Sequence, residues 1–487
     1  MQPQSSIFPL QPVQFSTGEE LVLRGGRELF PLLPQAFEGI NQIGFIGWGS
    51  QAPAQSQNLR DSLATVGSDI LVKVGLRLDS KSVAAAHAAG FTVDGSTLGE
   101  MFEVANTSDF LIVLISDGAM TKLWKPITEA MKPGATLGLS HGFLLGYLES
   151  IGEKLRTDIN VILMAPKGMG PSVRLLYLQG KETEGAGINS SVAVEQDVDG
   201  RAMDYALAWA VGTGSPATFF TTMRNEVISD LTGERAMLLG GLWGLSEALY
   251  ALFLSQGMKP EAAFLNSVKG LTSTVTRMIS ERGLKGLAEI IETYQCGAEF
   301  RNGYNMAYPV MDRIIREIYT KVASWQEIGE VVKETSALEH TPMSNIEASD
   351  MWKLDKSLYA AEAPVTPELA FAAGAFVAGV MAQMRILREH GHGTSEIANE
   401  SLIEIVDSLI PFMDKCGVSN MVDKCSITAR LGTRAWGPWF RQNLAKRLKS
   451  VPSSWETESY DTFLGDSLHG DIALCFQFRP PVRISVV

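Results

Sequence analysis

The chain contains two stretches that differ in the spacing of their apolar residues. Up to about residue 215, short apolar runs alternate with amphipathic segments such as 56–66 and 81–89, which have helical spacing. Strands that alternate with helices predict a mainly parallel, doubly wound α/β sheet. The predicted strands are QIGFIG (42–47), ILVKVGL (70–76), FLIVLIS (110–116), ATLGLS (135–140) and NVILMAP (160–166).

After GTGSPATFF (212–220) the pattern changes to long helical periodicity with few strand-like runs. This change predicts a second, all-helical part that begins near residue 216. Within it, residues 369–384 contain no charged side chain. The run is shorter than a membrane span and rich in Ala and Gly, so we expect a buried helix there.

The helical part also contains a candidate internal repeat. Residues 257–283 align without a gap with residues 391–417, at an offset of 391 − 257 = 134. The alternative is a chance match of two helical hairpins. The repeat predicts three parts, namely an α/β domain over 1–215 and two helical repeats over 216–362 and 363–487.

The two predicted repeats differ in their acidic residues. At the same offset, Asp230 corresponds to Pro364 in the second copy, while Glu400 and Glu404 correspond to Asn266 and Gly270 in the first. Glu234 corresponds to Glu368. Each copy therefore lacks acidic residues that the other has.

The amino-acid composition excludes some classes of binding partner and of cellular compartment. The formal net charge of −13 argues against nucleic acid, whose phosphates need a basic surface. Four cysteines without a CxxC pair indicate reduced thiols rather than a disulfide framework. The first residues lack the basic and apolar regions of a secretory signal, although an organelle transit peptide could already have been removed.

The stretch IGFIGWGSQAPAQ (43–55) has the pattern of a dinucleotide-binding turn between a strand and a helix. Gly47 permits the tight turn, Gly49 lets the backbone approach a pyrophosphate, and Ala52 is small enough for the third position. The alternative is a tight structural turn in an unrelated α/β protein. The predicted cofactor-binding residues are Gly47, Gly49, Ser50, Gln51, Ala52, Arg77, Ser80, Ser82 and Ser116.

The end of the second strand, GLRLDSKS, bears on which dinucleotide binds. A guanidinium from Arg77 and hydroxyls from Ser80 and Ser82 suit a ribose 2′-phosphate, so NADP is favoured over NAD. Asp79 would repel that phosphate if its side chain faced it. The alternative is a solvated polar loop.

Two acidic pairs are candidates for metal binding. Asp230 and Glu234 in SDLTGE, and Glu400 and Glu404 in NESLIE, lie four residues apart, which places each pair on one helix face. Such pairs are usually solvated, but both lie beside apolar sequence, where like charges are costly without a cation. His141 and Lys167 each follow a predicted strand, although a loop His or Lys is more often structural.

In this order the motifs IGWGSQAPAQ, LSHGFLLG, MAPKGMGPSVR, SDLTGER, NESLIE and CSITARLG closely resemble ketol-acid reductoisomerase in its long, plant-type form. The resemblance runs from about residue 20 to the C-terminus. It implies a Rossmann-like N-terminal domain and a knotted helical domain that is duplicated within the chain. It also implies a homodimer in a plastid with the transit peptide absent, the alternative compartment being the cytoplasm.

The resemblance implies a reaction of branched-chain amino acid synthesis: an alkyl shift in 2-acetolactate or 2-aceto-2-hydroxybutyrate, followed by reduction with NADPH, with two Mg²⁺ bound. It implies Asp230, Glu234, Glu400 and Glu404 as metal ligands, Asp230 being shared, and Glu404 as the ligand or acid–base group nearest the ketone. It further implies that Ser426 binds substrate and that His141 and Lys167 line the site as catalytic groups. The family's plant form has Lys and Gly where this chain has Leu78 and Asp79, which puts the preference for NADPH in doubt.

Two other functions fit part of the pattern. A metal-free NADP-dependent β-hydroxyacid dehydrogenase would use a lysine for acid–base chemistry and would not need Asp230 or Glu400. A non-catalytic NADP-binding interaction protein would turn over no ketoacid. In all three cases the expected ligands are small molecules, with no nucleic acid and no membrane.

Overall fold

The chain forms two compact units in a computed structural model that describes residues 3–183, 186–338, 343–358, 360–449 and 458–478. The first unit extends to Val227 and is joined by the segment that begins at Phe476, and the second comprises Ile228–Cys475. Helix α9 (Met223–Arg235) contains the junction. The junction lies after the boundary placed near residue 215, because β10 (Ala217–Phe220) pairs with the sheet of the first unit.

The first unit is built on a ten-stranded sheet with the strand order β1-β2-β10-β9-β8-β7-β6-β3-β4-β5. The six strands from β8 to β5 are mutually parallel, whereas β9 runs antiparallel to β8 and β2 antiparallel to β10. The mainly parallel, doubly wound sheet is therefore confirmed, and all five predicted strands are present. The strands are β1 (Leu10–Phe15), β2 (Gly18–Arg24), β3 (Gln42–Ile46), β4 (Leu71–Leu76), β5 (Leu98–Glu100), β6 (Phe110–Val113), β7 (Thr136–Leu139), β8 (Asn160–Pro166), β9 (Ser190–Gln196) and β10.

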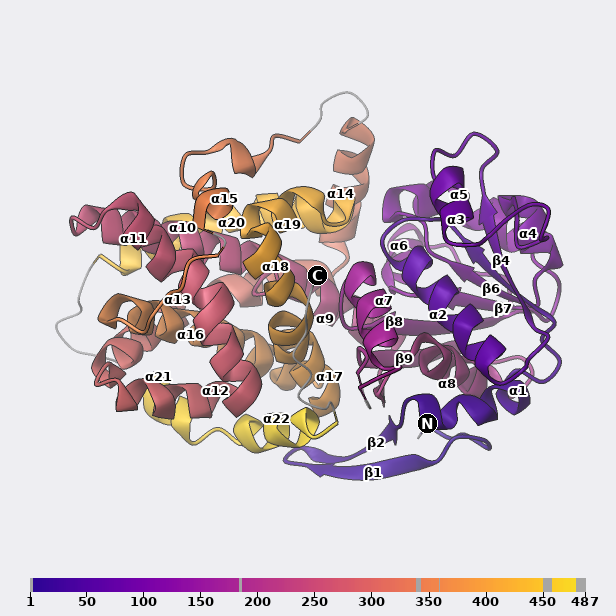
Figure 1. Cartoon of the computed structure of the whole chain (residues 1–487), viewed down its shortest axis with the longest axis horizontal. Helices are drawn as coiled ribbons and strands as arrows, with labels where there is room; N and C mark the ends of the chain where they lie inside the picture. The colour runs from indigo at the N-terminus through magenta and orange to yellow at the C-terminus, as the bar shows by residue number, and fades with distance from the viewer. Residues whose placement is uncertain (1–2, 184–185, 339–342, 359, 450–457, 479–487) are drawn as a thin grey trace. The chain divides into compact units, whose positions relative to one another are not determined.

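Helices cover both faces of this sheet (Figure 1). One apolar cluster joins strands to α1, α2, α3 and α8, and a second joins the strands to α4, α5 and α6. Strand β3 shows why both faces are apolar, since Phe45 packs in the first cluster and Ile46 in the second. The helices are η1 (Arg27–Leu32), α1 (Leu33–Ala36), α2 (Gln51–Thr65), α3 (Val83–Ala88), α4 (Met101–Thr107), α5 (Asp117–Ala130), α6 (Phe143–Ile151), α7 (Gly170–Gln179) and α8 (Ala202–Thr213).

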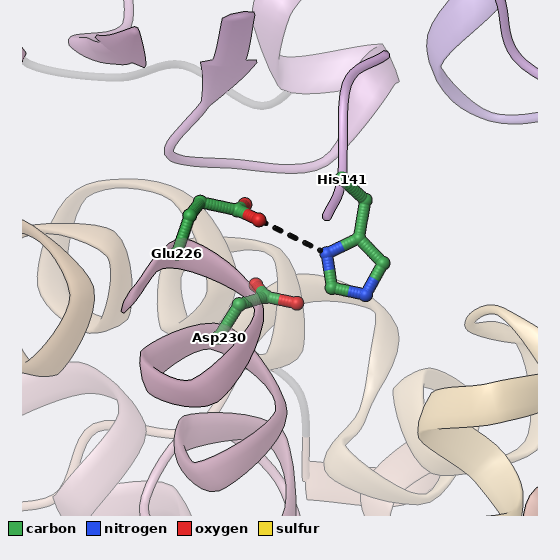
Figure 2. Close-up of side chains that lie close together, drawn as sticks. All are labelled: His141, Glu226 and Asp230. Atoms are coloured by element: carbon green, nitrogen blue, oxygen red, sulfur yellow. Dashed lines mark ion pairs between the residues drawn. The ribbon is translucent and has the colours of Figure 1, made fainter. Parts of the chain in front are cut away.

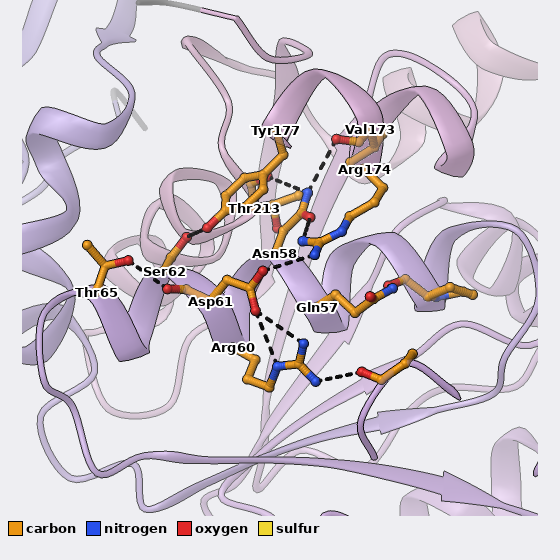
Figure 3. A network of polar contacts seen from close by, with 12 residues as sticks. Gln57, Asn58, Arg60, Asp61, Ser62, Thr65, Val173, Arg174, Tyr177 and Thr213 are labelled. Atoms are coloured by element: carbon orange, nitrogen blue, oxygen red, sulfur yellow. Dashed lines mark hydrogen bonds and ion pairs between the residues drawn. The ribbon is translucent and has the colours of Figure 1, made fainter. Parts of the chain in front are cut away.

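Helix α2, which follows the dinucleotide turn, is fixed to α7 and α8 by buried polar contacts (Figure 3). The Asn58 amide donates to the carbonyl oxygens of Val173 (3.3 Å) and Thr213 (3.0 Å). The Ser62 hydroxyl lies 2.9 Å from that of Tyr177. Because a buried amide or hydroxyl is costly without a partner, these contacts define one seating of α2 on its neighbours.

The second unit is helical. Its elements are the part of α9 from Ile228, α10 (Gly240–Ser255), α11 (Pro260–Phe264), η2 (Leu265–Lys269), η3 (Leu271–Val275), α12 (Thr276–Thr293), α13 (Gly297–Ala323), α14 (Gln326–Ala337), η4 (Ile346–Ala348), α15 (Leu354–Leu358), α16 (Pro367–Glu389), α17 (Thr394–Ala398), η5 (Asn399–Ile403), η6 (Ile405–Leu409), α18 (Ile410–Cys416), α19 (Val418–Lys424), α20 (Ile427–Arg447), α21 (Glu458–Leu464) and α22 (Leu468–Phe476).

Its two halves interlock. Helix α10 of the first half packs on α20 of the second, and α16 of the second half packs on α13 of the first. The second crossing depends on glycines, because a Cβ on Gly303 would lie 2.0 Å from the Phe371 carbonyl oxygen, and one on Gly374 would lie 1.9 Å from that of Phe300. Each half therefore completes its core with a helix of the other.

The offset of 134 residues also relates backbone conformations. Helix α11 corresponds to α17, and the π-helical turns η2 and η3 correspond to η5 and η6, each at that offset. Gly283 (φ 72°) and Gly417 (φ 95°), again 134 residues apart, both have positive φ. Since π-helix is rare, its recurrence at matched positions supports an internal duplication. The knot stays a prediction.

Two stretches are long and apolar enough to cross a membrane, Met223–Ser255 and Pro367–Glu389, but their most apolar windows are 78% and 94% buried within the protein. The second confirms the buried helix predicted over 369–384. The four cysteines are free, as expected from the sequence.

Candidate functional site

The candidate cofactor residues of the first unit follow strands that end at one edge of the sheet. Strands β3, β4, β6, β7 and β8 are parallel, so their carboxyl ends lie on the same side. Ligands of doubly wound sheets bind at this edge. Each of these strands is followed within three residues by a predicted site residue, namely Gly47 after β3, Arg77 after β4, Ser116 after β6, His141 after β7 and Lys167 after β8.

The turn after β3 has the geometry expected of a pyrophosphate site. Gly47 has φ 107°, and a Cβ there would lie 2.5 Å from the Leu114 carbonyl oxygen. Among the described residues, no atom outside Trp48, Gly49 and Ser50 lies within 4 Å of the position a Cβ would take on Gly49, so the turn is open at that residue. Ala52 is fully buried, as its packing role requires. The free N–H groups at the start of α2 can therefore approach a phosphate.

Glutamines of the same stretch connect three loops at this edge. The Gln51 amide donates to the Gly168 carbonyl oxygen (2.8 Å), and Gln55 donates to the Ser140 hydroxyl (2.9 Å). The Gln55 carbonyl in turn accepts from the Trp209 indole N–H (3.1 Å). Gln51, predicted to bind cofactor, thus also holds the β8 loop beside the turn.

Trp48, for which the sequence offered no reason, packs edge-on against Phe91, with ring centroids 5.6 Å apart. It contributes apolar contact to the cluster that includes α2. Its position within the turn is thus accounted for by packing.

The loop after β4 presents its polar side chains to solvent. Arg77 and Asp79 are exposed, and Ser80 and Ser82 are half-buried. The Ser80 hydroxyl accepts from the Ser82 backbone N–H (3.2 Å), which gives the loop a defined turn. Leu78 is 89% exposed, so neither it nor Asp79 is explained by the core.

His141 and Lys167 meet a residue that sequence reasoning missed, Glu226 of helix α9. One oxygen of the Glu226 carboxylate lies 3.5 Å from His141 Nδ1 (Figure 2). The other oxygen lies 3.5 Å from Lys167 Nζ. The Gly142 backbone N–H donates to it at 2.8 Å. Lys167 and Glu226 are buried, so the pair is largely shielded from water.

The charge of Glu226 follows from these neighbours. Burial raises the pKa of its carboxyl, but Lys167 and His141 lower it by more, so the pKa lies well below its ordinary value. The carboxylate therefore stays ionised and holds the Lys167 ammonium group and the His141 ring in place. The one sequence signal for Glu226 was its spacing of four from Asp230 on the same helix, a spacing common among surface acids.

Within the second unit, three acidic side chains converge. One carboxylate oxygen from each of Asp230, Glu400 and Glu404 lies within 4.8 Å of the others. Glu400 is fully buried and Glu404 is 8% exposed. Three carboxylates at this distance repel one another, and burial strengthens the repulsion. Oxygen ligands at this spacing fit Mg²⁺, which prefers carboxylates and keeps part of its water shell.

Glu234 lies one turn beyond Asp230 on α9 and pairs with a buried arginine. Arg235 NH1 is 2.5 Å from Glu234, and Arg235 Nε is 2.5 Å from Glu327. Burial lowers the pKa of Arg235, but Glu327 and Glu234 raise it by more, so the guanidinium stays charged. Glu234 therefore reaches a cation near Asp230 only in competition with Arg235.

Ser426 is the N-cap of α20. Its hydroxyl oxygen accepts from the Ala429 backbone N–H at 3.0 Å. The cap uses an acceptor site of the hydroxyl, and the O–H group can still donate to a ligand. The side chain is exposed.

Comparisons with known proteins give one consistent result. Residues 39–218 match the family described as acetohydroxy acid isomeroreductase, NADPH-binding domain, and residues 223–363 match ketol-acid reductoisomerase, C-terminal domain. The chloroplastic ketol-acid reductoisomerase of Spinacia oleracea is 47% identical over 99% of this chain and 83% of its own length. That of Pisum sativum is 46% identical over 99% and 85%.

A solved structure supports the fold. An NADH-preferring ketol-acid reductoisomerase from an uncultured archaeon superposes with a TM-score of 0.57 and 23% identity, over 66% of this chain and 95% of that one. The family matches cover both the dinucleotide domain and the first helical half, and the two plant relatives extend the match over nearly all of the sequence. This chain therefore belongs to the ketol-acid reductoisomerase family.

Proposed function

We propose that this chain converts 2-acetolactate, or 2-aceto-2-hydroxybutyrate, to the corresponding 2,3-dihydroxy acid in branched-chain amino acid synthesis. The observation that carries the proposal is the convergence of Asp230, Glu400 and Glu404 in a protein that also has a dinucleotide turn. A dehydrogenase that works without metal needs no such cluster.

The first step moves an alkyl group between adjacent carbons, which requires a Lewis acid on the hydroxyl and ketone oxygens. When bound, Mg²⁺ supplies that charge. Asp230, Glu400 and Glu404 offer oxygen atoms from two separate helical segments, which would hold the ions. Glu234 would be a further ligand.

Proton transfer needs groups beside the reacting oxygens. Glu404 is less buried than Glu400. It is assigned to the side of the substrate ketone, where it can hold or release a proton. His141 and Lys167 supply positive charge, and Glu226 orients both. Ser426 is assigned to the substrate through its O–H group.

NADPH, when bound, supplies the hydride for the second step. Arg77, Ser80 and Ser82 are assigned to its 2′-phosphate and Ser116 to the cofactor, beside the turn formed by Gly47 to Ala52. The exposed Asp79 reduces the electrostatic preference for that phosphate. We therefore expect NADPH to be preferred over NADH, with a smaller ratio than a lysine and glycine in this loop would give.

The test is NADPH oxidation with 2-acetolactate, with and without Mg²⁺, repeated with NADH. We expect turnover that requires Mg²⁺ and stops on addition of EDTA. Undiminished turnover in EDTA would instead identify a metal-free dehydrogenase, and no turnover of either ketol acid would leave a binding protein.

The chloroplastic relatives support a plastid location. The homodimer implied by the resemblance stays a prediction, which sedimentation velocity of the purified chain can test. Since both acidic segments belong to one chain, we expect the active-site ligands to be complete within a protomer.

A further inference from the structure

Behind the acidic cluster lies a buried chain of polar contacts that the reaction does not use directly. The Glu396 carboxylate accepts from the Ser229 hydroxyl (2.7 Å), and the same oxygen lies 2.9 Å from His392 Nδ1. The other ring nitrogen of His392 is 3.1 Å from the Tyr319 hydroxyl. Ser229 is fully buried, Glu396 is 1% exposed and His392 is 5% exposed.

The positions of these residues connect the two segments that carry the acidic cluster. Ser229 directly precedes Asp230 on α9. Glu396 lies one turn before Glu400 on the continuous helix formed by α17 and η5. The Ser229–Glu396 hydrogen bond therefore joins the α9 turn that carries Asp230 to the helix that carries Glu400.

The internal duplication gives an independent comparison. At the offset of 134 residues, Ser229 corresponds to Ala363, His392 to Met258 and Glu396 to Ala262. The backbone at α11 and η2 matches that at α17 and η5. These counterparts come from both halves, as do the counterparts of the acidic ligands, Pro364, Asn266 and Gly270. The counterpart region thus lacks the acidic ligands and all three polar groups, although its helices have the same form. Helix packing alone does not require the network.

We propose that Glu396, with His392 behind it, is a positioning residue for the divalent-cation site. Its bond to Ser229 fixes the separation of Asp230 and Glu400 before a cation binds, against the mutual repulsion of their carboxylates. The inference rests on the proposed function, because it takes Asp230 and Glu400 as cation ligands. Groups that orient metal ligands from behind typically change metal affinity roughly 10- to 100-fold when removed.

The test is a titration of the full-length protein with Mn²⁺ in the absence of substrate. The electron paramagnetic resonance signal of free Mn²⁺ measures how much of the ion is bound. Ser229→Ala removes the bridge and places at this position the residue that the chain has at Ala363. We expect Mn²⁺ affinity to fall about tenfold. The Mg²⁺ concentration that gives half the maximal rate should also rise about tenfold, and kcat should be recovered at saturating Mg²⁺. NADPH binding should stay as in the wild type.

Ser246→Ala is the matched control, because Ser246 is fully buried in α10 of the same unit and its hydroxyl has no hydrogen-bond partner among the described residues. It should leave Mn²⁺ binding unchanged. Glu396→Gln is a second variant that disrupts the network, because it keeps the side-chain volume and removes the charge beside His392. It should weaken Mn²⁺ binding in the same direction.

Wild-type Mn²⁺ affinity in both Ser229→Ala and Glu396→Gln would overturn the positioning role. The variant Asp230→Asn distinguishes failure of the positioning role from failure of the ligand assignment. If Asp230→Asn loses Mn²⁺ binding while the two positioning variants keep it, the cation site stands and the positioning role is wrong. If Asp230→Asn also binds normally, both are wrong.

Discussion

In the helical unit, the segments 265–275 and 399–409 have the same succession of π-helical turns, but of the two only the later one contributes buried carboxylates to the cluster with Asp230. At the position of Glu400 the earlier segment has Asn266, whose carbonyl oxygen accepts from the Thr366 hydroxyl at 2.6 Å. At the position of Glu404 it has Gly270, where a Cβ would lie 2.4 Å from Leu369.

The side chains that face these positions differ in the same way. Leu369, which closes the space at Gly270, corresponds at the offset of 134 to Arg235, which is buried against Glu234 and Glu327. The region around Asn266 and Gly270, to which both halves contribute, is filled by an apolar side chain and contains one neutral hydrogen bond. The region around Asp230, Glu400 and Glu404, to which both halves also contribute, contains the buried Arg235 guanidinium and a polar network. One backbone thus supports either a packed interface or a charged site.

The largest expected effect comes from replacing the buried arginine with the residue found at its counterpart position, Leu369, in Arg235→Leu. The change leaves Glu327 buried beside an apolar group, so we expect the free energy of unfolding to fall by about 3–5 kcal/mol. Urea denaturation measures it. Arg235→Leu with Glu327→Gln should recover part of the loss, and an equal loss in the double variant would contradict the role of the buried charge.

Next in size is the loss of a proposed ligand. Glu400→Gln should lower kcat/KM by roughly 10²–10³-fold, as removal of one charge-stabilising group does. The metal-free protein should become more stable, because a repulsive buried charge is gone. Steady-state NADPH oxidation and thermal unfolding in EDTA measure the two.

The counterpart substitution Asn266→Ala is the control for Glu400→Gln. It breaks the bond to Thr366, so it should cost about 1 kcal/mol of stability and leave turnover unchanged. A rate loss in Asn266→Ala as large as that in Glu400→Gln would show that the segments 265–275 and 399–409 do not differ in chemistry.

A smaller difference is expected between the two glycines with positive φ. A Cβ on Gly417 would lie 2.8 Å from the Asp355 carboxylate, whereas one on Gly283 would have only Ile472 at 4.0 Å. An alanine at either position would have to adopt a positive φ, which lowers the free energy of unfolding by about 1–3 kcal/mol. Gly417→Ala should therefore destabilise more than Gly283→Ala in urea denaturation, and the reverse order would contradict the crowding at Gly417.

The smallest effect concerns pH. Burial raises the pKa of Asp355 to about 6, although hydrogen bonds from Ser419 act in the opposite direction. The folded pKa exceeds the unfolded value, so this carboxyl favours folding most when protonated, and stability falls as pH rises from about 4 to 6. The loss is on the order of 1–2 kcal/mol, since the side chain is only partly shielded. Asp355→Asn should remove this slope relative to the wild type in denaturation at pH 4 and 6.5.

Much of the fold followed from apolar spacing. The five central strands are continuous apolar runs, which short parallel strands buried on both faces produce. Strand β1 (LQPVQF) was missed because it alternates polar residues and contains a proline, and β9 (SSVAVEQ) because serines begin it. The boundary was predicted too early because the four residues of β10 resemble a linker and were not recognised as a strand. The observed junction lies in α9.

The site divides in a similar way. Asp230, Glu400 and Glu404 were found because acids beside apolar sequence are unusual, and the structure brings them together. Glu226 was not found, because it lies in the first turn of α9, whose sequence is polar. Its burial arises from loops that are distant in the chain. The Glu396–His392 pair was missed for the same reason. Contacts between segments far apart in sequence leave no periodicity to detect.

The π-helical turns have a consequence for how this sequence can change. Each such turn holds one residue more than an α-turn, so removal of one residue would return the turn to α-helix and keep the direction of the side chains beyond it. In the segment 399–409 a deletion between Glu400 and Glu404 would leave the two acids three residues apart and change the spacing of their carboxylates. In the segment 265–275 the same deletion would remove no acidic residue. Loss of one residue would therefore change the acidic cluster in the later segment, whereas in the earlier segment it would change only local packing.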